Sequence, residues 1–127
     1  MAGELISVVR AMLSNFEKMN FDGVMSAIGK DGQGIDELSR AWMRSSVAMR
    51  KYFETVAGSV TNIRSKLTDV HEKVMGDVGI VTFWLEQDYK LGGKPQHISA
   101  PTTVVLQRGG GDWKIILFHS IPLPEGG

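Results

Sequence analysis

The sequence predicts an α+β fold in which helices pack on one face of an antiparallel sheet. Patterns with helical periodicity come first along the chain and strand-like patterns follow, so the two kinds of element are segregated. The last third is a succession of apolar-rich strands separated by glycine-containing turns. A chain of 127 residues fits one domain with its own hydrophobic core, so a single domain over residues 1–127 is expected.

Helices are expected before the sheet. Apolar residues at helical spacing predict the first helix over residues 3–19. Asn20 can cap a short second helix, and the glycines in residues 29–34 then predict a loop. Asp36 is the predicted N-cap of a third helix, which Gly58 closes. The apolar stripe expected on this third helix consists of Leu38, Trp42, Met49, Tyr52, Phe53 and Val56.

Two long strands are expected next. The first covers residues 59–74, and its alternation of apolar and polar residues slips after Leu67. This slip predicts a bulge near Thr68 and Asp69, because one extra residue in a strand shifts the alternation by one position. A glycine-containing turn then leads to the second strand, residues 78–89.

Two further strands complete the predicted sheet. The third covers residues 96–108 and contains Pro101, which has no backbone N–H and therefore requires an edge position or a bulge. The fourth covers residues 113–121, and Pro122 and Pro124 end it.

Both faces of this sheet carry apolar residues. In the last strand, Ile115 and Leu117 alternate with Ile116 and Phe118. An antiparallel sheet with one solvated face should instead alternate apolar with polar residues. Helices can cover one face, and we expect a second copy of the chain to cover the other, which gives a homodimer through the sheet face. The alternative is a third layer within the chain, but the chain is too short to supply one.

Composition excludes several classes of protein. Basic and acidic residues balance at fourteen each, so the charge of a general nucleic-acid binder is missing. The absence of cysteine excludes disulfides and thiolate metal sites. No window approaches the ~18 apolar residues of a membrane span, and Arg10 interrupts a start that lacks the basic region of a secretory signal. We therefore expect a cytoplasmic protein that binds neither nucleic acid nor a membrane.

Two stretches of the sequence carry a resemblance to a known family. The first is residues 16–28, with Asp22 at the start of the second predicted helix. The second runs from residues 100–108 through residues 111–115 to Phe-His-Ser at residues 118–120. In this pattern the chain resembles the SnoaL-like branch of the nuclear transport factor 2-like superfamily. That superfamily includes ketosteroid isomerases and the association domain of calmodulin-dependent kinase II.

The resemblance implies a cystatin-like cone, or α+β barrel, in which a strongly curved sheet wraps around helices and leaves a pocket at its open end. It also implies dimerisation through the outer face of the sheet. Family members have a short strand between the second and third helices, whereas residues 29–35 here are glycine-rich and lack strand-forming residues. We expect this segment to be shortened or disordered, so no catalytic group is carried over from it.

His119 and Asp22 are the candidate catalytic residues if the protein is an enzyme. His119 occupies the family's His-Ser position, where an imidazole could act as acid, base or ligand donor; a core histidine bonded to a neighbour is the alternative. Asp22 could orient a histidine, or could only stabilise the start of the second helix. His97 could carry a proton, or could be a surface residue near a turn. Because the sequence has no close-spaced histidine pair, we expect no metal, and no motif implies a cofactor.

Aromatic residues with polar tips could form the walls of a small-molecule pocket, although each is also compatible with an ordinary core. The predicted ligand-binding residues are Trp42, Tyr52, Trp84, His97, Trp113 and His119. The sequence therefore predicts a small-molecule-binding domain whose partner is a small, partly apolar organic molecule. The resemblance leaves two alternatives: an isomerase, cyclase or hydrolase on the same scaffold, and an oligomeric association module.

Overall fold

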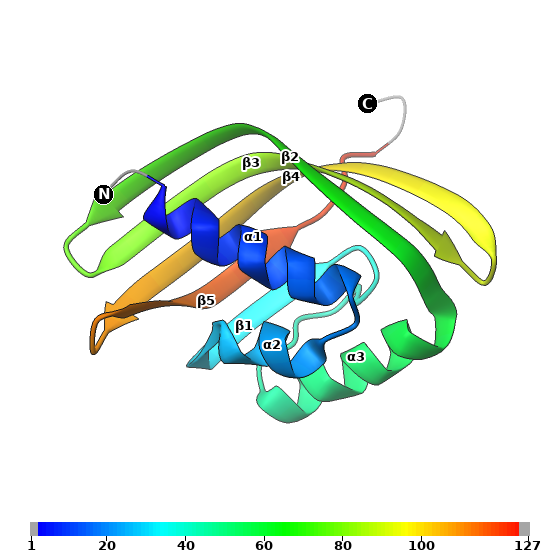
Figure 1. Cartoon of the computed structure of the whole chain (residues 1–127), viewed down its shortest axis with the longest axis horizontal. Coiled ribbons are helices and arrows are strands. Elements are labelled where there is room, and N and C mark those ends of the chain that lie inside the picture. Colours follow the sequence, from blue (N-terminus) through cyan, green and yellow to red (C-terminus); the bar gives the residue numbers. More distant parts are fainter. Residues whose placement is uncertain (1–2, 125–127) are drawn as a thin grey trace.

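The computed structural model describes residues 3–124 and has the predicted α+β architecture, a curved five-stranded sheet with helices on its concave side (Figure 1). The helices are α1 (Glu4–Glu17), α2 (Phe21–Ser26) and α3 (Ser46–Ser59). The strands are β1 (Ile28–Asp36), β2 (Val60–Met75), β3 (Val78–Leu91), β4 (Lys94–Gly109) and β5 (Asp112–Ser120). The sheet order is β1-β5-β4-β3-β2; β2 to β5 pair antiparallel, and β1 joins β5 in parallel.

The first two helices form where the sequence predicts them. The apolar stripe of α1 is buried against the concave face of the sheet. The Glu72 carboxylate on β2 accepts hydrogen bonds from the backbone N–H groups of Gly3 (2.9 Å) and Ile6 (3.1 Å), which satisfies donors at the start of α1 that have no helical partner. Asn20 caps α2, because its side chain accepts a hydrogen bond from Gly23 N at 3.2 Å.

The loop predicted over residues 29–34 is wrong, since this segment belongs to strand β1. The residues at its end pair in register with β5, from Gln33 opposite Leu117 to Asp36 opposite Ser120. Backbone hydrogen bonds to a neighbouring strand hold β1 in place, so weak strand propensity does not prevent it from forming. Gly32 is required by close packing, because a Cβ there would lie 2.4 Å from Ile28 Cγ2 and 3.0 Å from a backbone oxygen of β5.

The third helix begins ten residues later than Asp36, the N-cap that the sequence predicts, so that prediction is wrong. The actual N-cap is Ser45, whose hydroxyl accepts from Ala48 N at 3.1 Å. Asp36 instead closes a turn by accepting from the N–H groups of the residues two and three positions later. The side-chain bonds of such a turn are the same as those of a cap, so the sequence pattern does not separate the two. Helix α3 ends at Ser59 and leads directly into β2 at Val60.

Irregularities in the sheet explain its curvature. The predicted bulge is confirmed, because the β2–β3 register shifts between Thr68 and His71, where Asp69 has a φ of 54°. A second shift lies near Asn62, which has a φ of 55°. Such bulges bend a strand and increase its twist. Pro101 has the predicted edge position, because β4 pairs with β5 only from Thr102 onward.

The two faces of the sheet have different surroundings. The concave face is buried against the helices and forms the core, with Val81 and Leu106 completely inaccessible. The convex face remains partly exposed in the single chain. A row of apolar side chains crosses it in register, from Ile80 on β3 through Val105 on β4 to Leu117 on β5. The sequence therefore predicted correctly that both faces are apolar.

Candidate functional site

An inner cavity lies between the concave face of the sheet and the helices. Its space, including the open mouth, is about 770 Å³. Its apolar lining includes Met12, Phe16, Met49, Phe53, Leu85 and Phe118. The polar side chains that line it are Gln33, Asp36, Glu37, Tyr52, Gln87 and Ser120. A mostly apolar chamber with a few placed polar groups is the usual composition of a site for a small organic molecule.

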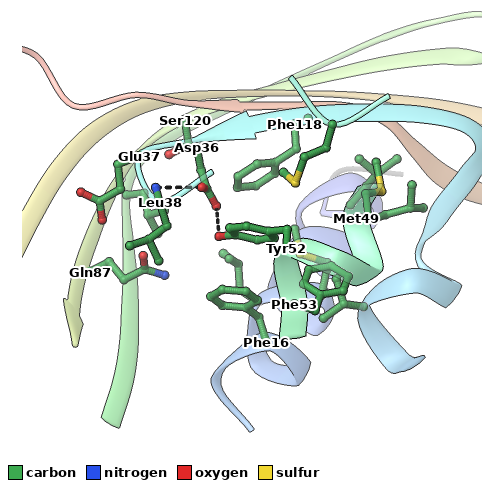
Figure 2. Close-up of a pocket in the computed structure, with 18 of the residues that line it drawn as sticks. Phe16, Asp36, Glu37, Leu38, Met49, Tyr52, Phe53, Gln87, Phe118 and Ser120 are labelled. Carbon is green, nitrogen blue, oxygen red and sulfur yellow. Dashed lines mark hydrogen bonds between the residues drawn. The ribbon is translucent and has the colours of Figure 1, made fainter. Parts of the chain in front are cut away.

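Asp36 lies at the centre of the polar groups (Figure 2). It is the last residue of β1, and its Oδ1 accepts the backbone N–H groups of Leu38 (3.0 Å) and Ser39 (2.8 Å). Its Oδ2 accepts the hydroxyl of Tyr52, on α3, at 2.6 Å. All three partners are donors, which is the pattern that an ionised carboxylate requires.

Glu37 and Tyr89 form a second pair of carboxylate and phenol. The Tyr89 hydroxyl donates to Glu37 Oε1 at 2.5 Å. Gln87 and Tyr89 alternate along β3 and are both buried on its inner face, with exposed fractions of 7% and 6%. The Gln87 amide nitrogen donates to Ser65 Oγ at 3.1 Å, and within residues 3–124 nothing donates to the Gln87 amide oxygen. Both tyrosine hydroxyls donate to carboxylates, so the acceptors outnumber the free donors at this end of the cavity.

The electrostatics of this cluster follow from its burial. Burial raises the pKa of Asp36 above its usual range, although its hydrogen bonds act in the opposite direction. Burial also raises the pKa of Glu37, and the nearby Asp36 charge adds to the effect. The pKa values of Tyr52 and Tyr89 are raised as well, mainly by burial and then by these carboxylates, so both phenols remain protonated donors at neutral pH.

Among the predicted ligand-binding residues, Tyr52 lines the inner cavity. His119 and Trp84 line a shallower groove on the convex side instead, and the Trp42 ring lies 5.8 Å from the His119 ring. The reason is a register shift in β5 after Ile115, which turns the following odd-numbered residues to the other face of the sheet. Strict alternation would have placed His119 on the same face as Trp113.

Two other predicted ligand-binding residues also lie outside the inner cavity. Trp113 is buried in the core, and its indole nitrogen donates to Glu4 Oε2 at 3.2 Å. His97 is exposed near the β3–β4 turn, where its Nδ1 lies 2.7 Å from Asp88 Oδ1. The hydrogen bond to Asp88 is the main cause that raises the pKa of His97. Their roles in binding a ligand stay predictions.

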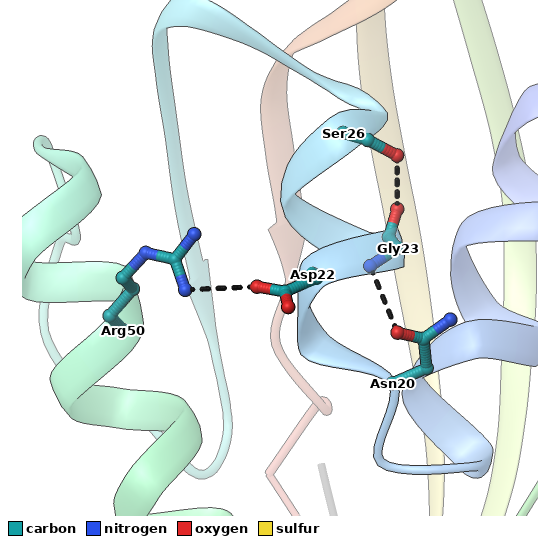
Figure 3. A network of polar contacts seen from close by, with 5 residues as sticks. All are labelled: Asn20, Asp22, Gly23, Ser26 and Arg50. Carbon is teal, nitrogen blue, oxygen red and sulfur yellow. Dashed lines mark hydrogen bonds and ion pairs between the residues drawn. The ribbon is translucent and has the colours of Figure 1, made fainter.

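Asp22 lies on the outside of the helical layer (Figure 3). Its side chain is 87% exposed and pairs with Arg50 on α3 at 3.2 Å. Asn20, and not Asp22, supplies the capping oxygen for α2. The structure therefore does not bring Asp22 and His119 together, since one lies on α2 and the other on the convex face of the sheet. A catalytic role for this pair stays a prediction.

The sequence analysis missed Asp36, Glu37 and Gln87 as site residues. Two consecutive carboxylates after a glycine-rich segment are visible in the sequence, but Asp36 was interpreted as a helix cap. Gln87 occupies an inward position of an otherwise apolar alternation on β3. A buried amide at such a position is a signal of a polar site, because buried polar groups need partners.

Two kinds of feature are missing from the part of the chain that the structure describes. No three His, Asp or Glu side chains gather there in a way that could hold a metal ion. No helix among residues 3–124 combines the length and the apolar character needed to cross a membrane.

Comparisons with known proteins agree with this architecture. The SnoaL-like domain family profile matches residues 5–124. A proposed dehydratase of the NTF2-like family from Streptomyces avermitilis has a similar structure, with a TM-score of 0.84, 20% identity, and coverage of 95% of this chain and 94% of that one. A ketosteroid isomerase-like protein from Erwinia carotovora atroseptica gives a TM-score of 0.80 and 14% identity, covering 98% and 99% of the two chains.

An association module has the same fold. The CaMKII hub of S. rosetta gives a TM-score of 0.81 and 15% identity, covering 94% of this chain and 95% of that one. Comparison with curated proteins gave no match. At such low identities these likenesses show a common fold, which hosts several unrelated functions.

Proposed function

The chain belongs to the SnoaL-like domain family, and from that premise we propose that its inner cavity binds a small, predominantly apolar organic molecule. One observation carries the proposal: an apolar chamber has polar side chains, the buried Gln87 and the half-buried Asp36 and Glu37, gathered at one end (Figure 2). The apolar walls favour binding of a hydrocarbon body, and the polar end fixes its orientation.

Filling the cavity should weaken binding. Leu38 lines the cavity from the irregular segment after β1, so a larger side chain there projects into the space without disturbing a helix. We expect Leu38→Trp to weaken binding of 2-phenylethanol by at least about tenfold, which corresponds to a loss of roughly 1.4 kcal/mol in the free energy of binding. Isothermal titration calorimetry measures this affinity.

The matched control is Val47→Trp. Val47 is 76% exposed and does not line the cavity, so this variant should bind 2-phenylethanol as the unmodified protein does. Equal affinity of the Leu38→Trp variant and the control would contradict the proposed location of the site.

A second candidate function is proton transfer within the same cavity. The Asp36 carboxylate, with its raised pKa, is suited to accept a proton from carbon, and the hydroxyl of Tyr52, which donates to its Oδ2 at 2.6 Å, holds the carboxylate in place. This arrangement supports an isomerase, a cyclase or another enzyme that begins by removing a proton next to a carbonyl group. Two of the structural neighbours are named as a proposed dehydratase and an isomerase-like protein.

This candidate predicts exchange of the acidic protons of a simple ketone. The protein should accelerate deuterium incorporation into 2-tetralone in heavy water, and Asp36→Asn should reduce that acceleration by about a hundredfold, the usual contribution of a general base. Proton NMR follows the exchange. The exposed carboxylate of Glu54 provides the control variant, Glu54→Gln, which should exchange at the full rate. A rate that is the same for both variants would contradict a catalytic role for Asp36.

We also propose that the chain forms a homodimer through the convex face of the sheet. The apolar row of Ile80, Val105 and Leu117 supports this, because an exposed apolar surface of this kind is typical of an interface. The likeness to the CaMKII hub, an association domain, is consistent with self-association. The binding site lies on the opposite, concave side, so dimerisation would leave the inner cavity free.

A further inference from the structure

The charged side chains around the inner cavity are all of one sign. Asp36 and Glu37 line it, and its lining includes no lysine, arginine or histidine. Within residues 3–124, neither carboxylate takes part in an ion pair. Arg44 contacts a lining residue of the cavity, because its Nε donates to Gln33 Oε1 at 3.1 Å, but the Arg44 side chain is exposed and does not line the cavity. Partly buried carboxylates without a counter-charge are unfavourable, so a cation in this cavity would be stabilised.

The hydrogen-bonding groups of this cluster also favour a ligand that donates hydrogen bonds. Tyr52 and Tyr89 already use their hydroxyl protons on Asp36 Oδ2 and Glu37 Oε1. Glu37 Oε2 and the amide oxygen of Gln87 have no donor among the described residues, and Asp36 Oδ2 retains a second lone pair. Gln87 is 7% exposed and lines the cavity, and its amide oxygen is an acceptor without a donor among the described residues. The free acceptor on Gln87 is an observation independent of the charges of Asp36 and Glu37.

We infer that the inner cavity selects an organic ammonium ion, an amine carried on an apolar body. An ammonium group has donors and no acceptor, which complements the free acceptor positions on Glu37 Oε2, the Gln87 amide oxygen and Asp36 Oδ2. Its positive charge compensates the two carboxylates, and its hydrocarbon body contacts the phenylalanines and methionines of the walls. This inference rests on the proposed binding function and names the class of molecule that the site prefers.

The test compares three probes of nearly equal size. 2-Phenylethylamine is a cation at neutral pH, 2-phenylethanol is neutral, and phenylacetate is an anion. By isothermal titration calorimetry the amine should bind about tenfold more tightly than the alcohol, because its hydrogen bonds are charge-assisted. Phenylacetate should bind more weakly than either, since it adds a negative charge beside Asp36 and Glu37.

Variants identify the groups that cause the preference. Glu37→Gln keeps an acceptor for Tyr89 but removes one charge, so it should reduce the ratio of amine to alcohol affinity several-fold. Glu54→Gln removes an exposed carboxylate of α3 and should leave the ratio unchanged. The ratio should also fall at acid pH, because protonation of Asp36 and Glu37 removes the negative charge that attracts the amine.

The outcomes separate the two proposals. If the alcohol binds but the amine binds no more tightly, the preference for ammonium is wrong and the binding function stands. A preference that persists fully in Glu37→Gln together with Asp36→Asn would also overturn the inference. If none of the three probes binds, the proposed binding function fails and this inference fails with it. The probe ranking uses the unmodified protein, so a variant that folds poorly does not prevent the test.

Discussion

Replacing Val105 by lysine should convert a dimer into a monomer. Val105 lies at the centre of the apolar row on the convex face, with Ile80 beside it on β3 and Leu117 beside it on β5. In a dimer through this face, the ammonium group would be buried without a partner. A buried charge without a partner costs about 3–5 kcal/mol. Such a loss of binding free energy raises the dissociation constant of the dimer by at least about a hundredfold.

Sedimentation velocity at micromolar concentrations measures this change. The matched control is Gln107→Lys, two residues along β4 on the same face, where the side chain is already polar and exposed. This control should remain dimeric. A monomeric unmodified protein at the same concentration would contradict the dimer outright, and a dimeric Val105→Lys variant would place the interface on another surface.

Replacing Gly32 by alanine should detach β1 from the sheet and disable the inner cavity. The added Cβ would lie 2.4 Å from Ile28 Cγ2 and 3.0 Å from the backbone oxygen of Ile115. The oxygen belongs to β5 and cannot yield without moving that strand. We expect a loss of about 2–3 kcal/mol in the free energy of unfolding, which is within the range for overpacking. Because Asp36 is the last residue of β1, its displacement should also weaken binding of 2-phenylethanol.

Urea denaturation and calorimetry on the same preparation measure both effects. Gly29→Ala provides the comparison, because the same strand there offers ordinary contacts of 3.4 Å or more. That variant should lose less than about 1 kcal/mol, the usual range for a substitution without a clash. Equal stability of the two variants would show that β1 tolerates movement, and that the close approach at Gly32 is not required.

Much of the fold could be predicted because it depends on local patterns. Helical spacing placed α1, and the position of Asn20 gave the cap of α2. The slip of alternation near Thr68 gave the bulge in β2. The apolar residues on both sides of β5 gave the two apolar faces of the sheet. Each of these signals is contained within a single element, in a window of about 11 to 18 residues or fewer, which is the range over which periodicity operates.

The errors arose where distant backbone decided the structure. Strand β1 is stabilised by pairing with β5, more than eighty positions later, and no local pattern in its glycine-rich sequence reports that pairing. The start of α3 was misplaced because a turn and a helix cap use the same aspartate bonds. The face occupied by His119 depends on one register shift, which reverses every later position in the strand.

The polar end of the cavity could not be assembled from the sequence for the same reason. Asp36 and Glu37 come from the end of β1, Tyr52 from α3, and Gln87 and Tyr89 from β3. Only the register of the sheet and the course of the segment after β1 bring these elements together. The individual residues carry a weaker signal, since a buried glutamine in an apolar strand indicates a polar site but does not identify its partners.

The direct junction between α3 and β2 limits how far the helix can move over the inner cavity. No residue separates Ser59 from Val60, and Gly92 N donates to Ser59 O at 2.9 Å, so the carboxyl end of the helix is anchored to the β3–β4 turn. The amino end is held as well, because Met43 and Gly34 exchange backbone hydrogen bonds of 3.0 and 2.8 Å shortly before the helix begins. Both ends of α3 are therefore fixed to the sheet, so we expect a molecule to enter through movements of the side chains that line the cavity and not through displacement of the whole helix.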